Sequence, residues 1–449
     1  MITYIERRGT VLKINITAIS NRLIWFITLV FLVLSLTISF ALGDADYGAY
    51  VLFVCLFGLI LCYLVRDQGR ITVSFTWMHM YMLLFIGVCY LSSLNALDPS
   101  VAMSRSFDIV KIFCMLIVLY MCFQREKSVD SLLKIGMWTG YIVCFYTVYY
   151  YGLDYFINVL SSSARIANDA LNANTVGLLG ANAIVMTVYY MMYDKPRWWN
   201  IIALPTLGIL AATGSRKALV FVVIGIVLLF VFKSFRSKNI VNSLAKLVAY
   251  LSILIIAFIG ILQLPIFSEV LERMSSMVDA FTGTGGDSSA IVRMALVDIG
   301  WDLFHQSPII GVGINNPAVY TYSIFGRENY YLHNNYIELL AGTGVIGVVT
   351  YYSMYAYLVY NMIRYHDFHS NEYVMVLILL MSQLVMDMGM VSYESKSTYF
   401  YMMLFYIEVQ ILRAKRRTSD EHTNNFNKRK TIHHRLSLPN TDISKARSV

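Results

Sequence analysis

The chain has 449 residues, of which 58% are hydrophobic and 14% charged, and its mean hydropathy is +0.60. A fold of this composition could not cover a water-exposed surface with polar groups, which excludes an ordinary soluble protein and predicts an integral membrane protein. The formal net charge of +8 comes mostly from residues 413–449. Such a basic tail is attracted to anionic lipid headgroups, so we expect membrane lipid and no nucleic acid as its partner.

The sequence lacks the motifs of several enzyme and transporter classes. It holds no P-loop, no glycine pattern of a dinucleotide site and no HExxH, so ATP-driven transport and zinc proteolysis lack their usual signatures. All six cysteines lie in predicted membrane spans and none forms a CxxC motif, which favours small core residues over a disulfide framework or a metal site. We expect neither a metal nor a cofactor.

Twelve apolar stretches are long enough to cross a bilayer, which takes about 20 helical residues. They centre on residues 23–42, 49–65, 72–92, 107–123, 132–151, 174–193, 199–213, 218–232, 244–263, 337–360, 373–390 and 397–412. Glycines inside several stretches and tyrosines at their ends suit helices in lipid, whereas a β-barrel would show short alternating segments. The sequence therefore predicts an all-α membrane protein of about 12 transmembrane helices, with helices 1 to 9 in residues 23–263 and helices 10 to 12 in residues 335–412.

The distribution of positive charge predicts the orientation. Residues 1–22 are polar and basic and lead into the first span without a signal-peptide cleavage site after it, so we expect them to stay in the cytoplasm. On that basis 16 Lys and Arg residues fall in short cytoplasmic segments and nine on the outer side, in agreement with the positive-inside rule. Both termini are then cytoplasmic, residues 264–334 form a large helical extracytoplasmic loop, and residues 413–449 form a tail that we expect to be disordered.

Two adjacent cations break the orientation rule in the turn Thr213-Gly214-Ser215-Arg216-Lys217, which falls on the outer side. Cations held there are suited to bind an anion such as a diphosphate, and Gly214 would let the backbone approach it closely. The alternatives are that the assignment of spans is shifted by one, or that Arg216 and Lys217 only extend toward lipid headgroups.

The connection between the fifth and sixth spans carries further polar residues on the same side. Arg165 is followed by Asn168, Asp169, Asn172 and Asn174, which could line the rim of a pocket. The same residues would also suit a solvated loop, and Asn174 could be the N-cap of the sixth span.

The large outer loop contains a predicted helix that begins after the flexible run 282–289. An apolar stripe at helical spacing is formed by Val292, Leu296, Ile299 and Leu303. This stripe predicts a helix that packs on the membrane domain or lies in its surface. Arg293 stands beside the stripe, so its planar guanidinium would be held where two hydrogen bonds to a phosphate can form.

A histidine stands just before the tenth span, in the run His333-Asn334-Asn335-Tyr336-Ile337-Glu338. A helix N-terminus favours a bound anion, and imidazole is the side chain best placed to exchange a proton near neutral pH. Glu338 could orient His333 or complement the helix dipole, and a histidine at a helix entry is also often only a cap. Gly344 and Gly347, further along the span, predict close helix packing.

Taken in order, these motifs resemble the O-antigen ligase and polymerase superfamily over roughly residues 160–350. The resemblance rests on the turn at Ser215-Arg216, on Arg293 followed by Pro308-Ile309-Ile310-Gly311-Val312-Gly313, and on the His333-Asn334-x-Tyr336-x-Glu338 entry to a glycine-rich helix. It implies an all-helical glycosyltransferase of the lipid-sugar-dependent GT-C type. Such enzymes transfer a glycan from an undecaprenyl diphosphate carrier at the outer face of the cytoplasmic membrane, without a nucleotide sugar or an obligatory metal.

The resemblance also implies roles for individual residues. Arg216 and Arg293 match diphosphate-binding arginines, and His333 matches the candidate base that takes the proton from the acceptor hydroxyl. The expected substrate-binding residues are Arg165, Asn174, Lys217, Asn334, Tyr336 and Glu338. The chain departs from the family pattern at Asn172-Ala173-Asn174, where the family has Asn-Pro-Asn, and at Asn168, where glycine is usual.

Three functions remain open at this stage. A polymerase would join undecaprenyl-diphosphate-linked repeat units into an O-antigen, capsule or exopolysaccharide, working beside a flippase and a chain-length regulator. A ligase would transfer the glycan to a lipid A core or another acceptor, using the same residues. A transporter of lipid-linked sugars or solutes would suit the number of spans, but we find no internal repeat and few ionisable residues inside spans, namely His79, Asp387 and Glu408. We favour the polymerase.

Overall fold

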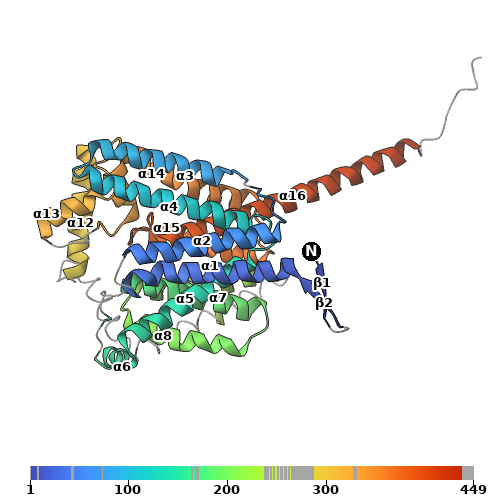
Figure 1. Cartoon of the computed structure of the whole chain (residues 1–449), viewed down its shortest axis with the longest axis horizontal. Helices are drawn as coiled ribbons and strands as arrows, with labels where there is room; N and C mark the ends of the chain where they lie inside the picture. Colours follow the sequence, from blue (N-terminus) through green and yellow to red (C-terminus); the bar gives the residue numbers. More distant parts are fainter. Residues whose placement is uncertain are drawn as a thin grey trace, which may run out of the picture.

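The computed structural model is a bundle of long helices (Figure 1). It describes residues 2–7, 10–41, 45–72, 74–162, 165–166, 171–236, isolated positions between 242 and 263, 288–326 and 331–436. The predicted ninth span, 244–263, lies mostly outside the described residues. Asn168, Asp169 and positions 282–287 of the predicted flexible run lie outside them too.

Two short strands precede the first helix, which the all-α prediction did not include. β1 (Ile2–Arg7) and β2 (Thr10–Asn15) pair antiparallel. α1 (Ile16–Ala41) follows at once and begins well before the predicted start at residue 23. The cause is local, because the side-chain oxygen of Asn15 accepts a hydrogen bond from the N–H of Ala18 (3.1 Å) and so caps the first turn.

The remaining elements are helices, of which eight described ones, α1 to α5, α7, α9 and α14, are long and apolar enough to cross a membrane. In chain order the elements after α1 are α2 (Ala45–Arg66), α3 (Trp77–Ser92), η1 (Ser93–Asn95), α4 (Pro99–Phe123), α5 (Asp130–Tyr151), α6 (Leu153–Ser161), α7 (Ala173–Tyr193), η2 (Trp198–Ile202), α8 (Ala203–Ala212), α9 (Arg216–Phe235), α12 (Ser288–Gln306), α13 (Asn316–Phe325), α14 (Asn335–Arg364), α15 (Asn371–Met386) and α16 (Lys396–Leu436). Two shorter apolar helical segments are Trp198–Ala212 and Asn371–Met386. The chain is a multi-pass membrane protein, and the count of about 12 spans stays a prediction.

The bundle has an apolar outer face, as expected for contact with lipid, and a packed centre. On α2 the side chains of Phe53 and Phe57 are 68% and 53% exposed, and a soluble protein would rarely leave such large apolar groups uncovered side by side. The first half of α16 is buried on every side from Thr398 to Val409. An apolar helix that is buried all round lies at the centre of its bundle.

The part of the predicted tail that the structure describes continues α16 as a helix, and disorder of the tail as a whole stays a prediction. α16 continues from the core through residue 413 to Leu436, and Figure 1 shows its second half extending away from the bundle. The segment from residue 396 to 436 contains neither glycine nor proline. A helix whose first turns are fixed by packing needs no new nucleus, so it propagates through polar residues that would not start a helix themselves.

The two ends of the bundle are distinct. In Figure 1, α12 and α13 lie at the left end, whereas the N-terminal strands and the outward part of α16 lie at the right end. We name them the α12 end and the tail end. α4 starts at the α12 end, because the N–H of Asp98 donates to the side chain of Asn316, the first residue of α13 (2.7 Å). α16 also starts there, since Glu394 just before it pairs with Arg105 of α4 (2.5 Å).

Candidate active site

Three separate segments of the chain bring four cations to one small pocket at the α12 end. The pocket is lined by Arg165, Asn174, Gly214, Arg216, Lys217 and Arg293, and we call it the cation pocket. Four cations and no carboxylate line it, so it favours a multiply charged anion. Its volume is about 20 Å³, room for about one water molecule, so a diphosphate would require the arginine side chains to move outward. Among the described residues, no group of three His, Cys, Asp or Glu could hold a metal ion.

The turn that presents Arg216 is held by its own backbone. Gly214 has φ +58°, a left-handed conformation that glycine adopts at little cost, and its N–H donates to the carbonyl of Ala211 (2.8 Å). The Thr213 hydroxyl oxygen accepts a hydrogen bond from the N–H of Ser215 (3.2 Å). Arg216 is therefore the first residue of α9, at the positive end of its dipole, where an anion is favoured.

Arg165 is tied to that same turn, although it lies far from it in the sequence. The N–H of Ile166 donates to the carbonyl of Ala212 (3.0 Å), and Nε of Arg165 donates to the carbonyl of Thr213 (2.9 Å). These bonds hold the guanidinium of Arg165 at the edge of the cation pocket, beside the turn that carries Arg216.

Asn172, and not Asn174, is the N-cap of α7. Its side-chain oxygen accepts from the N–H of Asn174 (2.9 Å), so the alternative reading of Asn174 as the cap is wrong, and Asn174 lines the cation pocket instead. α7 also packs directly on the α8–α9 turn, because a Cβ at Gly177 would lie 2.9 Å from the Cβ of Ser215. The start of α7 is thus a fixed wall of the pocket.

Lys217 joins the pocket to the connection between α15 and α16. Its ammonium donates to the carbonyl of Gly389, and it also lines the cation pocket. The charge of Lys217 therefore adds to that of the arginines, while its hydrogen bond holds the connection in place. Its role in substrate binding stays a prediction.

α12, which carries Arg293, docks on α14 through the predicted stripe. The stripe is confirmed, because its members pack into one cluster with Leu332, Ile337 and Ala341: Val292, Leu296, Ile299 and Leu303. Gly300 lies so close to α14 that a Cβ there would come within 2.2 Å of the Ile337 side chain. This contact sets the position of Arg293 relative to the entry of α14.

A Gly300→Ala variant is therefore expected to be less stable by about 1 to 3 kcal/mol, the usual cost of overpacking a close contact. The thermal midpoint in detergent measures this effect. Gly208→Ala is the matched control, since no atom lies within 4 Å of a Cβ at this helical glycine. Equal midpoints for the two variants would contradict the docking described for α12.

α14 is interrupted at Gly344, where φ is +65° and ψ −169°. The chain that follows α12 occupies the interruption: the N–H of Val345 donates to the carbonyl of Pro308 (3.0 Å), and the N–H of Val312 donates to the carbonyl of Ala341 (2.9 Å). Gly344 was predicted to allow close packing between helices, and in the structure its role is a different one. Gly344 lets the Pro-x-x-Gly-x-Gly segment hydrogen-bond to the backbone of α14.

His333 lies at the entry of α14 with φ +54°, a left-handed conformation that is uncommon outside glycine and that clusters at functional sites. Its ring packs on that of Tyr331, with 4.1 Å between centroids. Burial, followed by the charges of Arg293 and Lys217, lowers the pKa of His333 from 6.5 to about 4. The ring is therefore within electrostatic reach of the cation pocket, and it is neutral near pH 7 and able to accept a proton.

This pKa predicts the shape of the pH profile. Because His333 stays neutral until the pH falls to about 4, the rate of a reaction that uses it as a base should show its acid limb near pH 4 and not near 6.5. Initial rates across this range, on enzyme checked to be folded at each pH, measure it. An acid limb at 6.5 would contradict the environment described for His333.

Glu338 orients His333 through the backbone. It is 2% exposed, and its carboxylate accepts a hydrogen bond from the N–H of Leu332, the residue before His333 (2.9 Å). Holding this N–H fixes the loop from which the imidazole projects. Of the two alternatives considered for Glu338, the contact favours orientation of the histidine.

Asn334 and Tyr336 make structural contacts. The side-chain oxygen of Asn334 accepts from the N–H groups of Tyr336 (3.0 Å) and Ile337 (3.2 Å) and so caps α14. The hydroxyl of Tyr336 donates to the carbonyl of Leu384 in α15 (2.9 Å), and its ring stacks on that of Tyr352. Neither residue lines the cation pocket, and their binding of substrate stays a prediction.

A buried polar network under the α14 entry was missed by the sequence reasoning. The carboxylate of Asp387, fully buried, accepts from the side chains of Ser392 (2.6 Å), Gln383 (2.9 Å) and Tyr352 (3.0 Å). The N–H of Asn335 donates to the carbonyl of Asp387 (2.8 Å). The network joins α14, α15 and the connection to α16. Its one sequence signal was an ionisable residue inside a predicted span.

Asp387→Leu is expected to lower the free energy of unfolding by several kcal/mol, because each buried donor left unpaired costs about 1 to 3 kcal/mol. Asp298→Leu is the matched control, since Asp298 is exposed on α12. Thermal unfolding in detergent compares the two. Similar midpoints would mean that the network does not hold the entry of α14.

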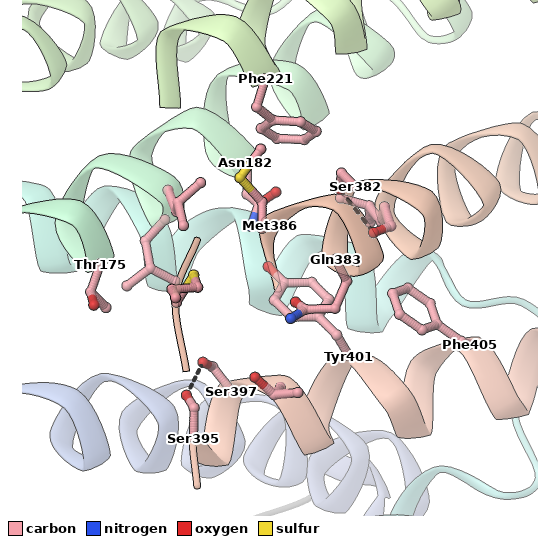
Figure 2. Close-up of a pocket in the computed structure, with 15 residues that line it drawn as sticks. Thr175, Asn182, Phe221, Ser382, Gln383, Met386, Ser395, Ser397, Tyr401 and Phe405 are labelled. Atoms are coloured by element: carbon pink, nitrogen blue, oxygen red, sulfur yellow. Dashed lines mark hydrogen bonds between the residues drawn. The ribbon is translucent and has the colours of Figure 1, made fainter. Parts of the chain in front are cut away.

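A second pocket, of about 80 Å³, lies between α7, α9, α15 and α16 (Figure 2). It adjoins the cation pocket along two segments, because Thr175 follows Asn174 and Met390 follows Gly389, the acceptor for Lys217. Its polar side chains include Thr175, Asn182, Gln383, Ser395 and Ser397, and Figure 2 shows them interspersed with Phe221, Met386, Tyr401 and Phe405. Hydroxyls and amides among aromatic rings can bind sugar hydroxyl groups.

Comparison with known proteins shows what this region is similar to. Residues 201–352 match the family described as O-antigen ligase, and they hold Arg216, Lys217, Arg293 and His333. The teichuronic acid biosynthesis protein TuaE of Bacillus subtilis (strain 168) is 27% identical over 172 residues, 37% of this chain and 34% of TuaE. The chain thus matches about a third of that relative's length. The match of residues 201–352 to the family described as O-antigen ligase agrees with the resemblance seen in the motifs.

Proposed function

We propose, from the match of residues 201–352 to the O-antigen ligase family and from the cation pocket, that the chain is a glycosyltransferase that polymerises undecaprenyl-diphosphate-linked oligosaccharide units into a surface polysaccharide. The observation that carries this proposal is the convergence of four cations from three separate segments, within electrostatic reach of a neutral histidine. A diphosphate donor suits the cations, and an acceptor hydroxyl suits the histidine.

In this mechanism Arg216 and Arg293 bind the donor diphosphate and stabilise the charge that develops as it leaves. The acceptor hydroxyl loses its proton to His333 while its oxygen attacks the anomeric carbon. The bond from that carbon to the diphosphate oxygen breaks as the new glycosidic bond forms. Attack opposite the leaving group inverts the anomeric centre, and cleavage of the glycosyl phosphate drives the reaction.

The proposal includes an orientation. We place the chain in the bacterial cytoplasmic membrane, with both termini in the cytoplasm and the α12 end at the outer face. The positive-inside count supports this orientation. Four of the nine outer positive charges also line the cation pocket, where an anionic ligand accounts for them.

The ligase remains the second candidate, because the matching family is described as O-antigen ligase. Its acceptor would be a lipid A core or another terminal glycan in place of a second repeat unit. A transporter is less well supported, since transporter sites lie near the bilayer midplane, whereas the cation pocket lies at one end of the bundle.

The experiment that tests the proposed function is reconstitution of the purified protein in lipid. The donor is the undecaprenyl-diphosphate-linked repeat unit made by the enzymes of the same gene locus. We expect a ladder of product lengths on a gel. A single transfer that appears only when a core acceptor is added would establish the ligase. No covalent product under either condition would overturn both.

A further inference from the structure

A larger cavity, of about 760 Å³, opens near the tail end, where α4 finishes. One wall is the connection from α4 to α5, which contributes Arg125 and Lys127. The other wall is a single face of α16, where lining residues follow one another at every fourth position: Ile407, Ile411, Lys415 and Ser419. This spacing aligns them along one side of the helix. We call this space the tail cavity.

The lining of the tail cavity changes along α16. The two isoleucines come first, in the part of α16 that is packed in the bundle, and Ile407 is only 2% exposed. Lys415 and Ser419 come later, where the helix side chains are exposed. The space therefore runs from an apolar inner part to a cationic, hydroxyl-rich mouth. A ligand that matches it has an apolar chain at one end and an anion at the other.

The charges of the tail cavity also favour an anion. Three cations line it against one carboxyl group, that of Glu126. Burial raises the pKa of Glu126, which favours its neutral form. Arg125 is held in place by an ion pair with Asp67 (2.5 Å) and a hydrogen bond to the Thr72 hydroxyl (3.1 Å). Because Arg125 is already paired, Lys127 on one wall and Lys415 on the other are the main positive charges that the cavity offers to a ligand.

We propose that the tail cavity binds an anionic phospholipid, with its phosphate between Lys127 and Lys415 and an acyl chain along Ile407 and Ile411. Basic pockets beside transmembrane helices bind lipid headgroups in this way. A lipid bound there would connect the α4–α5 connection to the outward half of α16 and so set the direction in which that helix leaves the bundle. This site is separate from the cation pocket and does not depend on the proposed function.

The test is native mass spectrometry of the full-length protein purified in detergent, with phosphatidylglycerol or phosphatidylcholine added. We expect wild type to retain phosphatidylglycerol selectively, and Lys127→Gln and Lys415→Gln each to bind it about fivefold more weakly, as about 1 kcal/mol per lost cation implies. Arg417→Gln is the matched control, because it removes one charge from the same exposed stretch of α16 but does not line the cavity.

Two results would overturn the proposal. Equal retention by Lys415→Gln and Arg417→Gln would mean that the lipid responds only to the overall charge of the tail. Loss of the bound lipid when inorganic phosphate is added would mean that the cavity selects a free anion and not a lipid.

Discussion

A His333→Gln variant is expected to transfer glycan about 10² to 10⁴ times more slowly than wild type, the usual contribution of a general base. Glutamine keeps a polar side chain at the entry of α14 but cannot take up the proton of the acceptor hydroxyl. The loss should therefore appear in kcat, with KM for the lipid-linked donor little changed. Initial rates with purified donor in lipid vesicles measure both constants.

The control for this prediction is His305→Gln, which changes an exposed histidine in the last turn of α12, at the same end of the bundle. That variant should retain wild-type rates. If His333→Gln, folded and inserted, remains within a few-fold of wild type, His333 is not the base.

Arg293→Ala is expected to lower kcat by about 10² to 10³, the cost of losing one positioned group that stabilises developing charge. Arg293 lines the cation pocket from a helix that is docked against α14, which fixes the position of its backbone. Arg293→Lys should lie between alanine and wild type, because lysine keeps the charge but loses the planar pair of donors.

Arg197→Ala is the matched control for Arg293→Ala. Arg197 is 51% exposed between α7 and α8, where it pairs with Asp194. Its loss should leave the rate unchanged. A rate for Arg293→Ala equal to that of Arg197→Ala would remove Arg293 from the proposed mechanism.

The cation pocket could be predicted from the sequence because Arg216 and Lys217 contradict the charge bias of the bundle, and because the stripe beside Arg293 specifies which face of α12 is buried. Both signals are local. Arg165 was expected at the rim of a pocket, but its hydrogen bond to the carbonyl of Thr213 could not be predicted, since that contact depends on how α7 packs beside the α8–α9 turn.

Around His333, by contrast, the sequence motif did not indicate the contacts that its residues make. Asn334 and Tyr336 belong to the recognised motif, yet their contacts are a helix cap and a bond to α15. Asn335, which with Asp387 holds the entry of α14, was not assigned a role, because a single sequence does not show which polar residues meet in a core. Composition does not indicate the helical start of the tail either, because a helix nucleated in the core can continue through polar residues.

The central claim is that the cation pocket binds the diphosphate of a polyprenyl carrier, and binding of undecaprenyl diphosphate without a glycan tests it most directly. Wild type and the double variant Arg216→Ala, Arg293→Ala would be compared in lipid nanodiscs. Each lost charge-assisted hydrogen bond is worth about 1.5 to 3 kcal/mol, so the double variant should bind at least about 100-fold more weakly, whereas wild type should prefer the diphosphate to the monophosphate. Equal affinity of both proteins for the diphosphate would contradict the account.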